Sequence, residues 1–200
     1  MRLFIGFVTI SIYMFTFSSM AAIPLDENSR PINQESIKIA NDGFAMRNLR
    51  KVGFGVGSAG SLGLLGAMIE LNFTSDMSLM TSFGLASNYQ TFGLQVKKIL
   101  GGKAFMPYFS AGYTRWYTTG DKGAIHKTTP KFFGDKFLNS EERSSGKIAE
   151  NILYPGFGFQ YMQLNGDWAG TSLYAEILLL IDVDDLQSEG TGGLGLIYYF

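Results

Sequence analysis

This 200-residue chain has a single histidine, His126, which is the first candidate to consider for catalysis. A histidine becomes a general base when it reaches a nucleophilic hydroxyl, and Thr128 follows it by two residues. The chain has no Gly-x-Ser-x-Gly elbow, and the segment around His126 is polar and rich in glycine. We therefore interpret His126 as a solvated loop residue, and we predict no catalytic residue, no cofactor and no enzymatic activity.

Carboxylates near the C-terminus form the second group with chemical potential. Ca²⁺ prefers carboxylate oxygens, and four acidic side chains lie close together, but their spacing differs from that of an EF-hand loop. These residues are Asp182, Asp184, Asp185 and Glu189. The chain has no cysteine, so a thiolate metal site is excluded. We interpret the group as an acidic surface loop and predict no metal site.

Several charges lie inside segments that otherwise alternate apolar with small or neutral residues. Glu70, Lys97 and Glu176 fall on the small-residue side of these segments, and Arg115 joins them if a bulge turns it inward. Enclosed charges are tolerated when they pair or stay hydrated. They predict either an ionic core that locks the strands together or, alternatively, a gate or narrow ion path.

The elements that carry these residues have period-two patterns typical of β-strands. One side of each is apolar, and the other holds mainly Gly, Ser, Thr and Gln. Several reach about ten residues, the length that crosses a bilayer when tilted. A soluble sandwich or lipocalin-like barrel would carry many charges on its outer side, so the pattern favours a membrane barrel. The segments are 52–57, 64–73, 77–86, 89–98, 107–117, 154–161, 172–181 and 191–200.

The connections between these segments fit a barrel with both ends in the periplasm, in which the connections after the second, fourth and sixth strands are short periplasmic turns. The first two extracellular connections are short as well. The predicted periplasmic turns 74–76, 100–103 and 164–167 are short. The extracellular connection 118–147 is long, and the last, 182–189, is acidic. This asymmetry indicates eight strands; six or ten remain alternatives, because the first segment is weakly marked.

The N-terminal region differs from the rest of the chain. After Arg2 come fifteen residues without a charge and then small residues, a pattern that predicts a signal peptide over 1–21; the alternative is a membrane anchor. Removing Arg2 leaves 15 basic and 17 acidic residues, which indicates no nucleic-acid partner. Residues 22–51 predict a flexible periplasmic leader with one helical turn; the alternative is a plug that enters the barrel.

The final segment, TGGLGLIYYF, has an apolar side that ends in Tyr198 and Phe200. It resembles the closing strand of bacterial outer-membrane β-barrels, and residues 52–200 resemble the eight-stranded OmpA-like and OmpX-like barrels. The resemblance implies an all-β, antiparallel, up-and-down transmembrane barrel in the outer membrane of a diderm bacterium. It also implies contact with outer-membrane lipid and lipopolysaccharide, and assembly by the barrel-assembly machinery, for which Tyr198 and Phe200 are the signal.

The same resemblance implies a class of function. Such barrels have structural, adhesion or surface-binding roles, here through the extracellular loops and a surface ligand. The alternatives are a narrow pore and an outer-membrane lipid-modifying enzyme. Enzymes of that kind use a histidine with a serine and an acid, whereas Thr128 stands here where a serine is expected.

Overall fold

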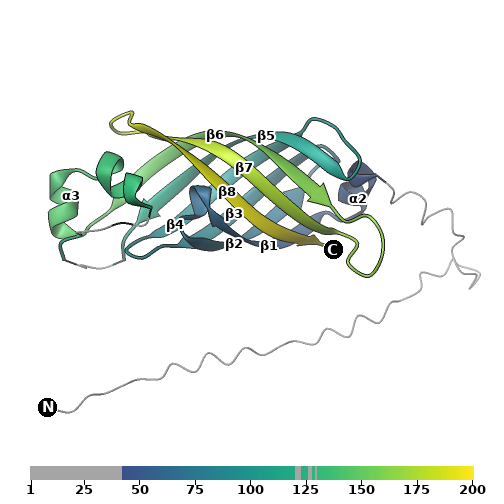
Figure 1. The fold of residues 1–200 in the computed structure, drawn as a ribbon, viewed down its shortest axis with the longest axis horizontal. Helices are drawn as coiled ribbons and strands as arrows, with labels where there is room; N and C mark the ends of the chain where they lie inside the picture. Colours follow the sequence, from purple (N-terminus) through teal and green to yellow (C-terminus); the bar gives the residue numbers. More distant parts are fainter. Residues whose placement is uncertain (1–41, 120–122, 126–127, 129) are drawn as a thin grey trace, which may run out of the picture. The chain divides into compact units, whose positions relative to one another are not determined.

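The computed structural model describes residues 42–119, 123–125, 128 and 130–200. Eight antiparallel strands form a closed barrel in which each strand pairs with its neighbour in sequence and β8 pairs with β1 (Figure 1). The prediction of an eight-stranded up-and-down barrel is therefore confirmed. The strands are β1 (Val52–Ala59), β2 (Leu65–Asn72), β3 (Met77–Leu85), β4 (Gln90–Ile99), β5 (Phe105–Tyr117), β6 (Ala149–Met162), β7 (Thr171–Asp182) and β8 (Ser188–Tyr199).

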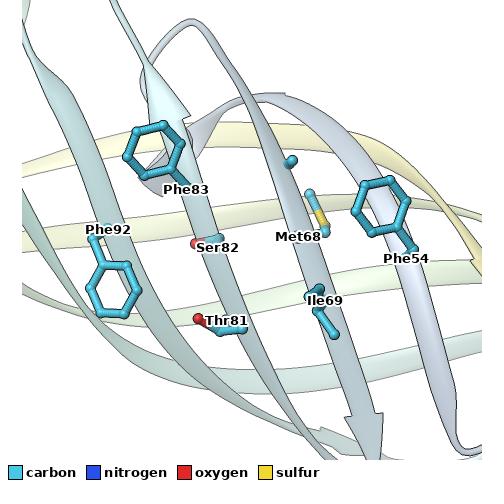
Figure 2. A pocket seen from close by; sticks show the side chains of 8 residues that line it. Phe54, Met68, Ile69, Thr81, Ser82, Phe83 and Phe92 are labelled. Carbon is cyan, nitrogen blue, oxygen red and sulfur yellow. The ribbon is translucent and has the colours of Figure 1, made fainter. Parts of the chain in front are cut away.

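The two sides of each strand differ as the alternation predicts. Ile69 is 43% exposed on the outer side of β2, while its neighbours Met68 and Glu70 are buried inside. Phe54, Phe83 and Phe92 are also exposed on the outer side of the sheet formed by β1–β4. They border a shallow depression over Thr81 (Figure 2). An outer surface of bare apolar side chains is favourable only against lipid, as in transmembrane barrels.

Glycines inside the barrel make room for large side chains on neighbouring strands. A Cβ atom added to Gly158 on β6 would lie 2.5 Å from the Tyr108 ring on β5. One added to Gly195 on β8 would lie 2.5 Å from the Tyr174 ring on β7. Any side chain at these glycines would displace a ring, so the alternation of glycine with aromatic residues fills a narrow interior without overlap.

Short turns and a helix lie at one end of the barrel. The turns join β2 to β3, β4 to β5 and β6 to β7, as predicted. Helix α2 (Gly43–Leu49) begins at Asp42, whose side chain accepts the Phe44 N–H, and lies at the same end as the C-terminus (Figure 1). No helix among the described residues is long and apolar enough to span a membrane. The predicted signal peptide, and the leader up to residue 41, lie outside the described residues.

The opposite end is closed by folded loops. Following the predicted topology, we call it the extracellular end and the end with the short turns the periplasmic end. After β1 the chain turns at Ala59, which has a φ of 63°, into the short helix η2 (Gly60–Leu62), whose residues are all buried. The long connection between β5 and β6 contains η3 (Phe133–Phe137) and α3 (Ser140–Ser145). Asn139 caps α3 through the backbone N–H groups of Glu141 and Glu142.

Candidate functional site

Glu70 is the centre of a buried polar network in the barrel interior. Its carboxylate contacts Arg47 Nη1 at 3.1 Å and Lys97 Nζ at 2.9 Å, and it accepts the Ser78 hydroxyl at 2.6 Å. The side chains of Arg47, Glu70 and Lys97 are at most 1% exposed. β-strand alternation on β2, β3 and β4 places three of these groups inward, and hydrogen bonds to both carboxylate oxygens compensate the cost of burying the charge.

Arg47 enters this network from α2, outside the predicted set of interior charges. Its guanidinium also donates to Ser75 O at 3.0 Å and lies 3.4 Å from the Tyr199 hydroxyl. The helix therefore inserts a cation into the periplasmic end of the barrel. The sequence offers a signal for the helix, because Asp42 is a good N-cap, but none for the insertion of Arg47 into the barrel.

Glu176 forms the second part of the network, as the sequence predicts. It is buried on β7, and its Oε2 accepts hydrogen bonds from Gln95 Nε2 at 2.9 Å and from the Tyr108 hydroxyl at 3.2 Å. Lys97 Nζ, which pairs with Glu70, lies 4.8 Å from the centroid of the Tyr108 ring, and the Tyr108 hydroxyl bonds to Glu176. Arg47, Lys97, Glu70 and Glu176 together balance two positive charges with two negative ones.

Arg115 does not join the network, so that part of the prediction is wrong. The register Phe92 to Arg115 to Asn151 continues without a bulge through β4, β5 and β6. Unbroken alternation leaves Arg115 exposed on the outer side, while its neighbours Thr114 and Trp116 are fully buried inside. At this height a long cationic side chain extends toward the polar edge of a bilayer.

A cluster of aromatic side chains fills the extracellular end of the lumen. The rings of Tyr89 and Trp116 stack with centroids 4.9 Å apart, and Phe133 lies 4.6 Å from each of them. Phe133 and Phe137 come from the long loop and are at most 2% exposed. The loop therefore covers the mouth of the barrel with its aromatic residues.

Between the two ends, η2 folds into the lumen. Leu62 is 3% exposed and packs in the same cluster as Met68 and Tyr174. The Thr114 hydroxyl lies 3.4 Å from Ser61 O, which ties η2 to β5. Helix α2, the charge network, η2 and the aromatic cluster thus each place buried side chains in the barrel interior.

The other candidate residues have local structural contacts. The Thr128 hydroxyl accepts the Gly134 N–H at 2.8 Å and lies 2.9 Å from Pro130 O, so it braces the long loop. His126 lies outside the described residues. Within the acidic group, the Asp185 side chain accepts the Gln187 N–H, and Glu189 pairs with Lys136 of the long loop.

The C-terminal residues lie as the sequence predicts. Tyr198 and Phe200 are 42% and 63% exposed on the outer side, while Tyr199 is buried in the lumen. The Phe200 N–H donates to Val52 O at 2.9 Å, which completes the pairing of β8 with β1. Arg50 donates to Tyr199 O at 2.8 Å. Both ends of the barrel sequence are thus joined at the periplasmic rim.

Solved structures with this architecture are distant in sequence. The N-terminal β-barrel domain of Pseudomonas aeruginosa OprF superposes with a TM-score of 0.52 at 18% identity, covering 74% of this chain and 96% of that domain. The chain has the fold of the small eight-stranded outer-membrane barrels. The Yersinia pestis outer membrane protein Ail aligns over 76% of this chain and 99% of its own, with 16% identity and a TM-score of 0.40. No protein-family model and no curated protein matches the sequence.

Proposed function

We propose that this chain is an outer-membrane protein whose barrel is a closed anchor and whose extracellular loops bind a partner at the cell surface. The observation that carries the proposal is the filled lumen. The interior holds side chains that are each at most 3% exposed, among them Arg47, Glu70, Lys97, Leu62, Trp116 and Phe133. An eight-stranded barrel is only wide enough for its own side chains, so this arrangement favours anchoring over transport.

The same arrangement weighs against the alternatives. A gate or ion path needs hydrated charges, whereas Glu70 and Lys97 pair directly and are shielded from solvent. A lipid-modifying enzyme needs a free nucleophile, and the Thr128 hydroxyl already bonds within the loop. We therefore propose that the protein neither conducts ions nor catalyses a reaction, and that its surface loops carry its activity.

The long loop and the β7–β8 loop supply one binding surface. The ion pair of Lys136 with Glu189 joins them. Leu186, at the tip of the β7–β8 loop, is 75% exposed and has a φ of 60°. A large exposed apolar side chain in a strained loop position suits contact with a partner better than contact with water.

Excising residues 120–145 and joining the strands by a short turn tests the proposal. Folding should persist, because the free energy of loop closure depends weakly on length. Adherence of cells displaying the variant to one another and to cultured cells should fall to background, with Asp167→Asn in a periplasmic turn as the unchanged control. Retained adherence would exclude this loop as the binding element. A separate measurement on the intact protein addresses the pore: unit conductance in planar bilayers would favour that alternative.

Localisation has a separate test at the C-terminus. Deleting Phe200 removes one backbone hydrogen bond and an exposed ring, which costs little stability. If the assembly machinery reads this residue, the variant should nevertheless accumulate in the periplasm and become sensitive to protease. Tyr161→Ala, which removes an exposed aromatic ring from β6, is the matched control and should insert normally. Normal outer-membrane levels of the deletion variant would contradict the proposed signal.

A further inference from the structure

Buried charges divide into two groups along the barrel. The buried charged side chains of the described residues are Arg47, Glu70, Lys97, Glu150, Glu176 and Asp182. Both cations belong to the periplasmic network, where Glu70 and Glu176 balance them. Glu150 and Asp182, at the extracellular ends of β6 and β7, are 5% and 1% exposed, and no buried cation in the described part of the chain accompanies them.

Further carboxylates surround this uncompensated pair. Carboxylate oxygens of Glu150, Asp182 and Asp184 lie within 4.8 Å of one another. The Glu142 carboxyl, on α3 of the long loop, is within hydrogen-bonding reach of Glu150. Among the described residues no N–H or hydroxyl donates to the Glu150 carboxylate, and the Asp182 carboxyl also lies within hydrogen-bonding reach of it. Burying such a group costs several kcal/mol unless a positive charge joins it.

We propose that Glu150, Asp182 and Asp184, with Glu142 as a fourth ligand, form a Ca²⁺ site at the extracellular rim. All the donors are carboxylate oxygens, which hard cations prefer, and the group has no sulfur or imidazole for a softer metal. Mg²⁺ keeps several waters and is bound by one or two carboxylates, whereas several carboxylates from separate segments suit the larger, more flexible Ca²⁺ shell.

The proposed site would tie the loops to the barrel. Its ligands come from the long loop, from β6, from the end of β7 and from the β7–β8 loop. Asp182 is already oriented, because its Oδ1 accepts the Asp184 N–H at 2.9 Å and its own N–H donates to Gln187 O. Calcium would thereby fix the proposed binding surface over the aromatic cluster. The cation-binding inference itself does not depend on that function.

Terbium luminescence provides a direct test on the full mature chain, refolded in detergent without lipopolysaccharide. Trp116 pairs across strands with Glu150, so its excitation should sensitise Tb³⁺ bound at this site. Ca²⁺ should displace Tb³⁺ in the range of about 0.1–1 mM, as at extracellular calcium modules, and Mg²⁺ should require at least about tenfold more. Ca²⁺ should also raise the unfolding temperature.

Matched variants decide the assignment. Glu150→Gln and Asp182→Asn should each abolish the sensitised emission and the thermal shift, while both variants keep the heat-modifiable gel migration of a folded barrel. Asp185→Asn removes one negative charge from the β7–β8 loop outside the cluster and should behave like the unaltered protein. Emission that survives Glu150→Gln, an equal thermal shift in all variants, or no saturable Tb³⁺ signal at all would overturn the proposal.

Discussion

The two halves of the lumen are filled by different chemistry. In the periplasmic half, Glu70 pairs with two cationic side chains, and one of them, Arg47, comes from a helix that precedes the barrel. In the extracellular half, Tyr89 and Trp116 stack with Phe133, which comes from a loop. Removing one partner of a buried ion pair strongly destabilises a protein, because it leaves the other charge uncompensated. A loop that packs through aromatic side chains can instead open as a unit while the rest of the protein stays folded. We therefore expect the periplasmic half to contribute more to the stability of the barrel than the extracellular half.

Glu70→Gln is the strongest test of the role of the periplasmic half. It leaves the buried Arg47 and Lys97 without their carboxylate, so we expect the free energy of unfolding to fall by about 3–5 kcal/mol. Urea titration of the protein in lipid vesicles measures this change. Arg115→Gln removes a charge from the exposed side of β5 and is the control, with little effect. A loss below about 1 kcal/mol for Glu70→Gln, typical of exposed ion pairs, would show that the network is hydrated.

Ile69→Arg tests the neighbouring residue on the opposite side of β2. An arginine that faces lipid at the bilayer midplane costs about 2–4 kcal/mol, falling toward the interfaces. We expect a loss in this range in vesicles, measured by the same urea titration. Ile69→Ala is the control for lost packing alone. If Ile69→Arg folds as stably as Ile69→Ala, the outer side of β2 does not contact the acyl chains.

Phe133→Ala should affect the extracellular half alone. In a cooperative core such a truncation costs about 3–5 kcal/mol, but a loop that opens separately limits the cost to its own local stability. We expect faster amide exchange and proteolysis within residues 118–148, and nearly unchanged barrel unfolding. Phe132→Ala changes a partly exposed ring of the same loop and should be milder. A full core-sized loss of barrel stability would make the two halves one cooperative unit.

The sequence predicted the strands better than the helix and loops that fill the two ends of the barrel. Period two alone placed Glu70, Lys97 and Glu176 inside, because alternation repeats without reference to distant residues. Arg115 required a bulge, which the continuous register from Phe105 to Tyr117 does not contain. Arg47 lies on a seven-residue helix whose insertion depends on the assembled barrel, so no local pattern could place it.

The loops show the same limit. Phe133 and Phe137 were recognisable as aromatic residues that need a partner, yet their partners, Tyr89 and Trp116, lie on other segments. Asp182 and Asp184 were recognisable as a cluster, but Glu150 joins them only through the pairing of β6 with β7. Contacts between segments distant in sequence therefore account for most of what the sequence alone did not predict.

Asp76→Asn should have the smallest effect and sharpens the contrast between buried and exposed pairs. Asp76 lies in the β2–β3 turn, where a hydrogen bond from Lys98 and another from Thr74 lower the pKa of its carboxyl from 3.8 to about 2. A lowered folded-state pKa contributes stability that is present above the unfolded value and lost as the pH falls through the folded value. The unaltered protein should therefore be slightly more stable than the variant at neutral pH, and this difference should decrease steeply between about pH 4 and pH 2. Because both side chains are largely solvated, added salt should reduce the difference as well, which thermal unfolding at two ionic strengths would measure. A difference of the same size at about pH 7 and about pH 2 would mean that the aspartate acts through the turn's backbone geometry rather than through its charge.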